Sequence, residues 1–396
     1  MGQIEINHTG SGGGVVLSSD GSDLLLGGTA IGGSPDLYRD NAVNATTPTA
    51  AGDNGIAIGS SSSASGNYAI ALGGNSSSGG SIASGNGSVA LGGSKSTGIG
   101  SFSAIIGSNA SNGALANYAI AIGRNAKGNS VGSLALGYNT DALSNYSSAI
   151  GQNSSGDGSQ TTSGLGAMAL GGSYASGTNS FAAAIADNTS SYGATGANSV
   201  ALGYQAKASN SYAFAVGQSN LASAFGSVAI GRNSTASGNY SVTLGNQAVA
   251  AQQSKMAFSS GRFAADGDAQ AGTFVLRSDT TNATAEAMTT SNGTAGSTNQ
   301  IVAASDTCIT FSGTIVAMQN GAQSYGSWKI EGLLVNDGGT TTLANSAITV
   351  IQNASSWGLA LSADNTNNAL AITVTGEASH NIRWVANVQT AEVTYA

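Results

Sequence analysis

The chain has 396 residues, of which 59 are glycine and only 8% are charged, and its formal net charge is −8. This composition is far from that of an average globular domain. The 11 Lys and Arg residues are not clustered, which excludes the basic patch of a nucleic-acid-binding protein. No stretch approaches the roughly 18 apolar residues of a membrane-spanning helix, and the single cysteine excludes an intrachain disulfide framework.

The first 54 residues predict a small docking element and a linker. Residues 3–8 alternate like a strand, and residues 15–26 are typical of a hairpin around an Asp-Gly turn. We therefore expect a β-element over residues 1–34. Pro35 and Pro48 indicate an extended linker over residues 35–54. The N-terminus lacks the basic and apolar regions of a secretory signal peptide, so we expect none.

Residues 55–250 repeat one phrase about every 14 residues: an apolar residue, a small residue, then Ile, Leu or Val, then glycine. Thirteen copies are found, such as Ile56–Gly59 and Val228–Gly231, if Ala186 takes the place of one closing glycine. The period is too short for helix pairs, so each copy predicts one flattened coil with a strand on each face. We expect Ile, Leu and Val to fill the gap between the two sheets, with Ala and Ser letting the sheets approach. A disordered linker has a similar composition, but the regular phase of the apolar residues argues against it.

Residues 251–396 predict a second β-domain. It contains all three tryptophans, and Trp328 and Trp384 alternate with apolar neighbours as core residues do. Short strands broken by polar turns are typical of an antiparallel β-sandwich or jelly roll. We expect seven strands, at residues 273–277, 308–318, 327–335, 347–351, 358–362, 369–375 and 382–395. The fold class expected for the chain is therefore all-β.

The repeat resembles a known family. Ser88–Gly92, Ser199–Gly203 and Ser227–Gly231 are similar to the 14-residue head repeat of YadA-type trimeric autotransporter adhesins. The resemblance implies a left-handed parallel β-roll in which three chains pack around a common axis. We expect neither the heptad stalk nor the membrane anchor of those adhesins, because the sequence contains neither pattern.

A second resemblance concerns the C-terminal domain. Residues 325–332, 357–364 and 382–386 look like the C-terminal domain of bacteriophage fibre proteins, including those of marine hosts. It implies a virion protein that is assembled in the host cytoplasm and needs no export signal. The expected function is a homotrimeric phage tail fibre that binds a host-cell receptor such as a glycan, with residues 1–34 attached to a tail or capsid protein. The alternatives are a capsid-attached fibre or decoration protein, a bacterial trimeric adhesin and, last, a polysaccharide depolymerase.

The sequence offers few candidates for catalysis or metal binding. Asp266 and Asp268 form a close acidic pair, which is more typical of a turn than of a cation site. His8 and His380 lie at opposite ends of the chain, and Cys308 is expected to be a small buried hydrophobic residue. We therefore expect no enzyme, no cofactor and no metal.

The receptor-binding residues that we expect all lie in the last domain. They are Trp357, Asn365, Asn367, Asn368 and Tyr325. An aromatic face beside amide donors and acceptors suits a sugar ring, so these residues are the predicted contact with a host glycan.

Overall fold

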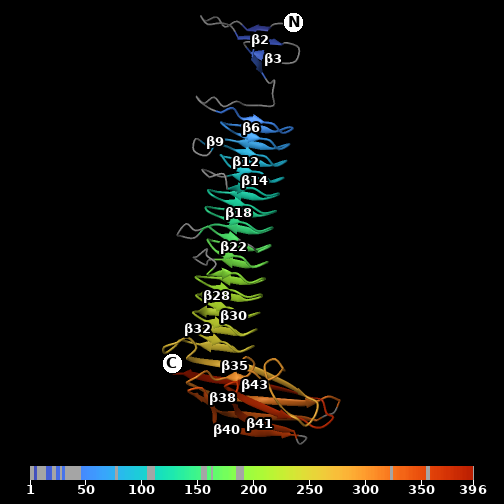
Figure 1. Cartoon of the computed structure of the whole chain (residues 1–396), viewed down its shortest axis with the longest axis vertical. Helices are drawn as coiled ribbons and strands as arrows, with labels where there is room; N and C mark the ends of the chain where they lie inside the picture. The colour runs from blue at the N-terminus through green and yellow to red at the C-terminus, as the bar shows by residue number, and fades with distance from the viewer. Residues whose placement is uncertain are drawn as a thin grey trace. The chain divides into compact units, whose positions relative to one another are not determined.

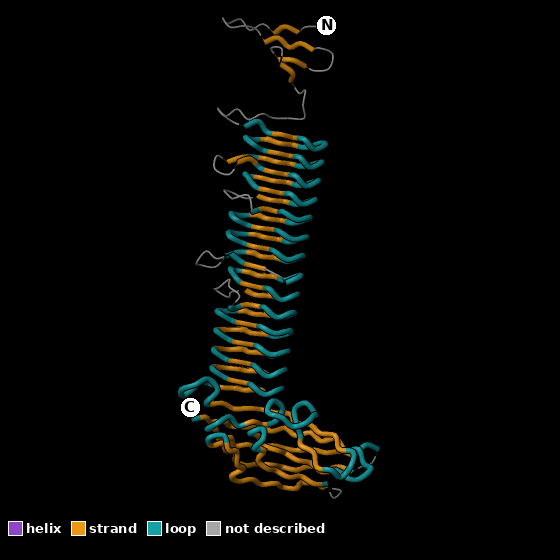
Figure 2. The backbone as a smooth tube through the Cα atoms, viewed as in Figure 1, coloured by secondary structure: helices purple, strands orange, loops and turns teal. Residues whose placement is uncertain are grey.

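A computed structural model (Figures 1 and 2) describes most of the chain. The described residues are 4–6, 15–19, 24–26, 29–31, 46–75, 79–104, 112–152, 158–161, 164–183, 191–321, 324–353 and 357–395. Over these ranges the chain is all-β, and no helix that could cross a membrane occurs in them. The chain divides into two compact units, residues 1–172 and 173–396, which are described in turn.

Unit 1 begins with a small antiparallel sheet. It consists of β1 (Ile4–Ile6), β2 (Val15–Ser19), β3 (Leu24–Leu26) and β4 (Thr29–Ile31), paired in this order. β2 and β3 pair Leu17 with Leu26 and Ser19 with Leu24, which confirms the predicted hairpin over residues 15–26. Pro35 lies outside the described residues.

The rest of unit 1 consists of flattened coils that contribute one strand to each of two parallel sheets. The strands of the repeated phrase, called phrase strands below, are β6 (Ile56–Ile58), β8 (Ile70–Leu72), β12 (Val89–Leu91), β14 (Phe102–Ala104), β16 (Ile120–Ile122), β18 (Leu134–Leu136), β20 (Ser148–Ile150) and β22 (Met168–Leu170). The opposite strands are β5 (Thr49–Ala50), β7 (Ser63–Ala64), β11 (Ile82–Ala83), β13 (Lys95–Ser96), β15 (Gly113–Ala114), β17 (Lys127–Gly128), β19 (Asp141–Ala142) and β21 (Gln160–Thr161). A short hairpin of β9 (Gly74–Asn75) and β10 (Gly79–Gly80) interrupts one coil. Equivalent residues of successive coils pair in register, as Ala121 does with Ala135.

Unit 2 begins with the same construction. Its phrase strands are β24 (Phe181–Ala183), β26 (Val200–Leu202), β28 (Phe214–Gln218), β30 (Val228–Arg232), β32 (Val242–Asn246) and β34 (Met256–Ser259). The opposite strands are β23 (Tyr174–Ala175), β25 (Gly193–Ala194), β27 (Lys207–Ala208), β29 (Leu221–Ala222), β31 (Thr235–Ala236) and β33 (Val249–Ala250). The two units together hold a parallel β-solenoid of about 13 coils, which confirms the predicted repeat. The closing residues expected at Gly107 and Ala186 lie outside the described part, although β14 and β24 belong to their coils.

The interior of each coil differs from the sequence-based expectation. The middle residue of the phrase points inward, and Ala57, Ala121 and Ala229 are at most 2% exposed. The large residues on either side of it point outward, so that Ile122 is only half-buried and Ile230 is 37% exposed. The expectation that Ile, Leu and Val fill the gap is therefore wrong. Successive side chains of a strand point to opposite faces, and the interior of a coil this thin is filled mainly by small side chains, Ala, Ser and Thr.

Glycine closes the phrase because the turn leaves no room for a side chain. Gly217 has a φ of +116°, a conformation that L-residues rarely adopt. A Cβ atom at this position would run into the carbonyl oxygen of Gly231 in the next coil. The same clash occurs at Gly123, Gly203, Gly231 and Gly245, so the close stacking of these coils depends on glycine at the end of the phrase.

Unit 2 ends in a two-sheet antiparallel sandwich. The larger sheet has the order β35 (Ala269–Thr280), β43 (Ile382–Thr394), β38 (Thr307–Gln319), β39 (Tyr325–Asp337) and β40 (Thr340–Asn353). In the smaller sheet, β42 (Ala369–Thr375) pairs with β41 (Gly358–Asp364), β36 (Ala285–Ala287) and β37 (Ile301–Val302). The predicted strands are all present. One apolar core lies between the sheets, and it contains Trp328 and Trp384 as predicted, 2% and 1% exposed.

Within unit 2 the coils join the sandwich directly. β34 pairs in parallel with β32 on one side and antiparallel with β35 on the other, so the phrase sheet continues into the larger sheet of the sandwich. The end of the opposite sheet is held by a side chain. The Val249 N–H donates to Oε1 of Gln270 at 2.9 Å, and Nε2 of Gln270 donates to the Val249 carbonyl at 3.0 Å.

Candidate functional site

The outer side of the phrase sheet in unit 2 is an apolar face. It is formed by the large residues that flank each inward-pointing Ala or Thr. These residues are Val200, Leu202, Phe214, Val216, Val228, Ile230, Val242 and Leu244, which are half-buried except for the more exposed Ile230. They form a continuous ladder, because each pairs with its equivalent in the next coil. A contiguous apolar surface of this kind is typical of an interaction site.

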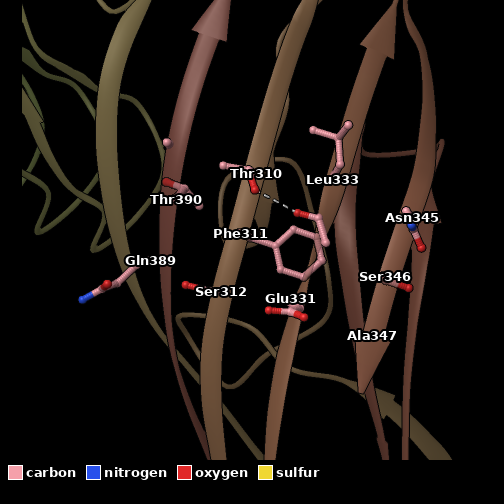
Figure 3. Close-up of a pocket in the computed structure, with 12 residues that line it drawn as sticks. Thr310, Phe311, Ser312, Glu331, Leu333, Asn345, Ser346, Ala347, Gln389 and Thr390 are labelled. Carbon is pink, nitrogen blue, oxygen red and sulfur yellow. Dashed lines mark hydrogen bonds between the residues drawn. The ribbon is translucent and has the colours of Figure 1, made fainter. Parts of the chain in front are cut away.

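The outer side of the sandwich has a different chemistry. A hollow of about 690 Å³ lies over β38, β39, β40 and β43 (Figure 3). A neighbouring hollow of about 590 Å³ shares part of its lining. Thr310, Ser312, Glu331 and Gln389 line the first hollow from exposed positions. These hydroxyl, amide and carboxylate groups can hydrogen-bond a polar ligand such as a sugar.

Sequence reasoning missed the residues of this hollow. The available signal was the alternation in residues 309–312, where buried Ile309 and Phe311 alternate with exposed Thr310 and Ser312. Such alternation identifies the outer face of one strand. It does not show which polar residues of neighbouring strands gather beside it, because that depends on the register of β38 with β39 and β43.

Two of the predicted receptor-binding residues lie at one end of β41. Trp357, just before this strand, is 3% exposed and packs in the core with its ring 5.6 Å from that of Trp384. A buried ring presents no face to a ligand, so the prediction of Trp357 as a sugar platform is wrong. Tyr325 is 56% exposed. Tyr325 is the first residue of β39, and the next residue, Gly326, pairs with Asn353 of β40. The Asn353 side chain donates a hydrogen bond to the Trp357 carbonyl, so Tyr325 and Trp357 lie at the same end of the sandwich.

The three predicted asparagines lie at the other end of β41. They form the turn to β42, and the strand of seven residues separates them from Trp357 by about 20 Å. Asn365 accepts a hydrogen bond from the Thr341 N–H at 2.7 Å, and Asn368 accepts one from the Thr341 hydroxyl at 3.2 Å. Asn367 donates to Asp364 at 2.7 Å. The structure thus separates the predicted cluster into two groups and gives the asparagines a role within the turn.

The acidic pair Asp266 and Asp268 forms a turn, as predicted. The Asp268 carboxylate accepts hydrogen bonds from the N–H groups of residues 263, 264 and 265 at 2.6–2.9 Å. Burial alone would raise the pKa of Asp268, but these donors outweigh burial and hold the pKa below its ordinary value of 3.8. Asp266 forms an exposed ion pair with Arg262. Among the residues that the structure describes, no three His, Cys, Asp or Glu side chains gather as metal ligands would.

A buried ion pair lies where the last coil meets the sandwich. Nζ of Lys255 is 2.6 Å from Oε2 of Glu392, and the two side chains are only 5% and 7% exposed. Gln270 and Thr390 also donate to the Glu392 carboxylate, at 2.8 and 2.7 Å. The Lys255 ammonium lies 5.6 Å from the centre of the Phe274 ring. Sequence reasoning missed this pair, because 137 residues separate its members.

Two smaller expectations concern the outer face of the sandwich. Cys308 is half-buried on the side of β38 that faces away from the core, so its expected burial is wrong. Arg383 and Glu331 carry opposite charges, and the sequence alone favours neither an ion pair between them nor separate solvation. In the described part of the chain the structure gives them no ion pair, and both side chains are exposed.

Comparison with protein families identifies the repeat. The model of the YadA head domain repeat matches residues 50–76, 79–94, 129–154, 194–220 and 222–251. The matched segments cover less than half of the chain, and they support a β-roll similar to that of the YadA head. The matched segments end at residue 251, so the resemblance of residues 300–396 to phage fibre domains, including those of marine phages, stays a prediction. No curated protein matches the chain.

Two solved structures of phage tailspikes are similar at low scores. One is the tailspike protein gp49 of Acinetobacter baumannii bacteriophage Fri1, a capsular polysaccharide depolymerase, with 9% identity, a TM-score of 0.20, and coverage of 91% of this chain and 75% of the tailspike. The other is the tailspike of Acinetobacter baumannii phage AM24, with 10% identity, a TM-score of 0.21, and coverage of 90% and 75%. These scores are too low to carry an argument about the activity of this chain.

The expectation that the chain is no enzyme is corrected by this comparison. It rested on the absence of a recognisable catalytic motif, and on that ground a polysaccharide depolymerase stood last among the alternatives. One of the similar tailspikes is a capsular polysaccharide depolymerase, so the expectation no longer stands. Motifs read along a sequence miss carboxylates that only a fold or a neighbouring chain brings together.

Proposed function

We propose that three copies of this chain form an adhesive phage tail fibre, which attaches the phage particle to its host. In this proposal residues 1–34 bind a tail protein, and the Pro-containing segment predicted over residues 35–54 joins them to the shaft. The coils of the shaft begin within that segment, at β5 (Thr49–Ala50), and continue to residue 250, and residues 251–396 form the tip. The observation that carries the proposal is the apolar outer face of the phrase sheet.

The energetics of this face favour association with further copies. Burying a Val, Leu or Ile side chain completely is worth about 1.5–3 kcal/mol. The eight flanking residues of unit 2 are roughly half-buried in a single chain, so covering them contributes on the order of several kcal/mol per chain. The interior of the same coils consists mainly of Ala, Ser and Thr, and such small side chains give a single chain a weak core.

Three copies also suit the role of the tip. The hollows over β38 and β39 offer hydroxyl, amide and carboxylate groups that fit a host glycan. A single shallow site of this kind binds weakly, but three sites on one tip raise the overall affinity through their high effective concentration.

The mass of the chain in solution tests the trimer. Light scattering should give three times the chain mass of 38.4 kDa. Ile230→Asp puts a charge on the outer face and should lower that mass while the coil stays folded. A wild-type chain that remains at 38.4 kDa would contradict the proposal.

Imaging of particles tests the place of attachment. An antibody to residues 300–396 should label the free end of tail fibres. Labelling of the capsid would instead identify a capsid fibre or decoration protein, and labelling of a bacterial surface would identify a cellular adhesin. Incubation of the chain with a polysaccharide that it binds, followed by measurement of new reducing ends, would reveal a depolymerase.

A further inference from the structure

One turn of each coil holds a residue in the left-handed conformation just before the phrase strand. Tyr118, Tyr146, Tyr212 and Tyr240 occupy this position with φ between +58° and +59°. Large L-residues disfavour this conformation. The coil between Tyr118 and Tyr146 has Gly132 there, with φ of +63°, and the coil between Tyr212 and Tyr240 has Gly226, with φ of +61°. Glycine therefore satisfies the turn, and backbone geometry does not account for the tyrosines.

In unit 2 these tyrosines form an aromatic ridge with Phe225. The ring of Phe225 lies 5.2 Å from that of Tyr212 and 5.5 Å from that of Tyr240, in edge-to-face geometry. The exposed fractions are 56% for Tyr212, 38% for Phe225 and 54% for Tyr240. The Tyr240 ring lies over Gly226 of the preceding coil, where a Cβ atom would come within 2.9 Å of Cδ1. The ridge is thus ordered by packing and still open to solvent.

The spacing of the ridge is regular. Tyr212 and Tyr240 are equivalent residues two coils apart, so their rings repeat after about 9.6 Å. This is close to the length of two sugar rings in an extended polysaccharide. Unit 1 contains an independent copy of the arrangement, because Tyr118 and Tyr146 are also two coils apart and are 63% and 67% exposed.

Asparagine amides accompany the tyrosines of unit 1. Asn117 and Asn145 directly precede Tyr118 and Tyr146, and both are exposed. Each accepts through Oδ1 from a backbone N–H of the preceding coil, at 2.9 and 3.1 Å. Within the described residues, Nδ2 of these two asparagines has no partner, so each of the two coils presents an amide donor next to its tyrosine.

We infer that this aromatic edge of the roll binds an extended polysaccharide along its length. The inference rests on the proposed function and adds a second glycan contact outside the tip. Sugar rings have apolar C–H faces that pack on aromatic rings, and their hydroxyls pair with tyrosine hydroxyls and asparagine amides. A linear polymer is favoured over another copy of the chain, because its repeat matches the two-coil spacing and the apolar outer face already offers a surface for association.

The test uses the full chain and replaces tyrosines by glycine, the residue that Gly226 supplies at the same turn position in the coil between Tyr212 and Tyr240. Tyr212→Gly/Tyr240→Gly removes the two rings and relieves the left-handed strain, so the fold and the mass should not change. The control is Tyr204→Ser, which removes a 51% exposed tyrosine from the other turn of a coil. An array of purified bacterial surface polysaccharides provides the probes, with fragments of defined length from the polymer that binds most tightly.

We expect the double variant to bind that polymer at least 10-fold more weakly, and the control to bind within 2-fold of wild type. Fragments shorter than three sugar rings should bind weakly, since they cannot reach both tyrosines. Equal binding by the double variant, or a change in its mass, would overturn the inference. A wild-type chain that binds host cells but no polysaccharide would also overturn it and leave the proposed function standing. A chain that binds no cells would overturn the proposed function itself.

Discussion

Replacing Glu392 by Gln tests how strongly the buried ion pair holds the last coil of the roll to the sandwich. At the observed distance of 2.6 Å, two unit charges attract by about 6 kcal/mol at an effective dielectric constant of about 20, and by about 1.6 kcal/mol in bulk water. Desolvation of both charges offsets much of this attraction. Removing one partner, however, leaves the Lys255 ammonium buried without an anion, which costs about 3–5 kcal/mol.

The chain contains a matched control for this experiment. Arg262 and Asp266 are also 2.6 Å apart, but their side chains are 44% and 34% exposed. Asp266→Asn should therefore cost no more than about 1 kcal/mol. The two pairs differ mainly in burial, so the comparison isolates the effect of desolvation.

Urea unfolding followed by tryptophan fluorescence measures both variants, because all three tryptophans lie in the core of the sandwich. We expect Glu392→Gln to lower the free energy of unfolding by about 3–5 kcal/mol. Lys255→Met/Glu392→Gln should recover part of the loss, since no unpaired charge remains. The reasoning is refuted if Glu392→Gln costs no more than Asp266→Asn.

Three further predictions concern the coils and the junction. Ala229→Asp should destabilise the roll by about 3–5 kcal/mol in thermal unfolding, because it buries an unpaired charge. Ile230→Asp should cost less than about 1 kcal/mol and should mainly reduce the mass in solution. Equal melting temperatures of the two variants would contradict the inward orientation of Ala229. Gly217→Ala should cost about 1–3 kcal/mol or more, from its positive φ and the collision with the next coil, and an unchanged melting temperature would argue against that turn. The lowered pKa of Asp268 means that the stability from its carboxylate is fully present above pH 3.8 and is lost as the pH falls through the folded pKa. Asp268→Asn should therefore be less stable than wild type at neutral pH and show a weaker loss on acidification, as circular dichroism during a pH titration would measure.

The repeat could be predicted from the sequence because its period and its glycines depend on local geometry. The side of the strand that faces inward could not. Alternation divides a phrase such as Val228-Ala229-Ile230 into two sets, and hydrophobicity favours burying the larger set. The structure buries Ala229 instead, because the distance between the two sheets limits side-chain size. The small residue kept at the middle of nearly every phrase was the available signal.

The candidate site was less predictable than the fold. Trp357 and the asparagines of residues 365–368 are close in sequence, but β41 runs between them and carries them to opposite ends of the sheet. The hollow over Ser312, Glu331 and Gln389 joins three strands whose members are far apart along the chain. Trp357 and the asparagines are close in sequence but far apart in the sheet. Ser312, Glu331 and Gln389 are far apart in sequence, but strand pairing brings them together.

The junction in unit 2 also limits how the coils can grow. The last strand of a parallel ladder exposes a row of unpaired N–H and C=O groups, which another chain could extend into a filament. Here β35 runs antiparallel along β34 and occupies the edge of one sheet, while the carboxamide of Gln270 bonds both the N–H and the carbonyl of Val249 at the edge of the other. Both edges are sealed by residues of the same chain, so this end of the stack is closed to end-to-end polymerisation.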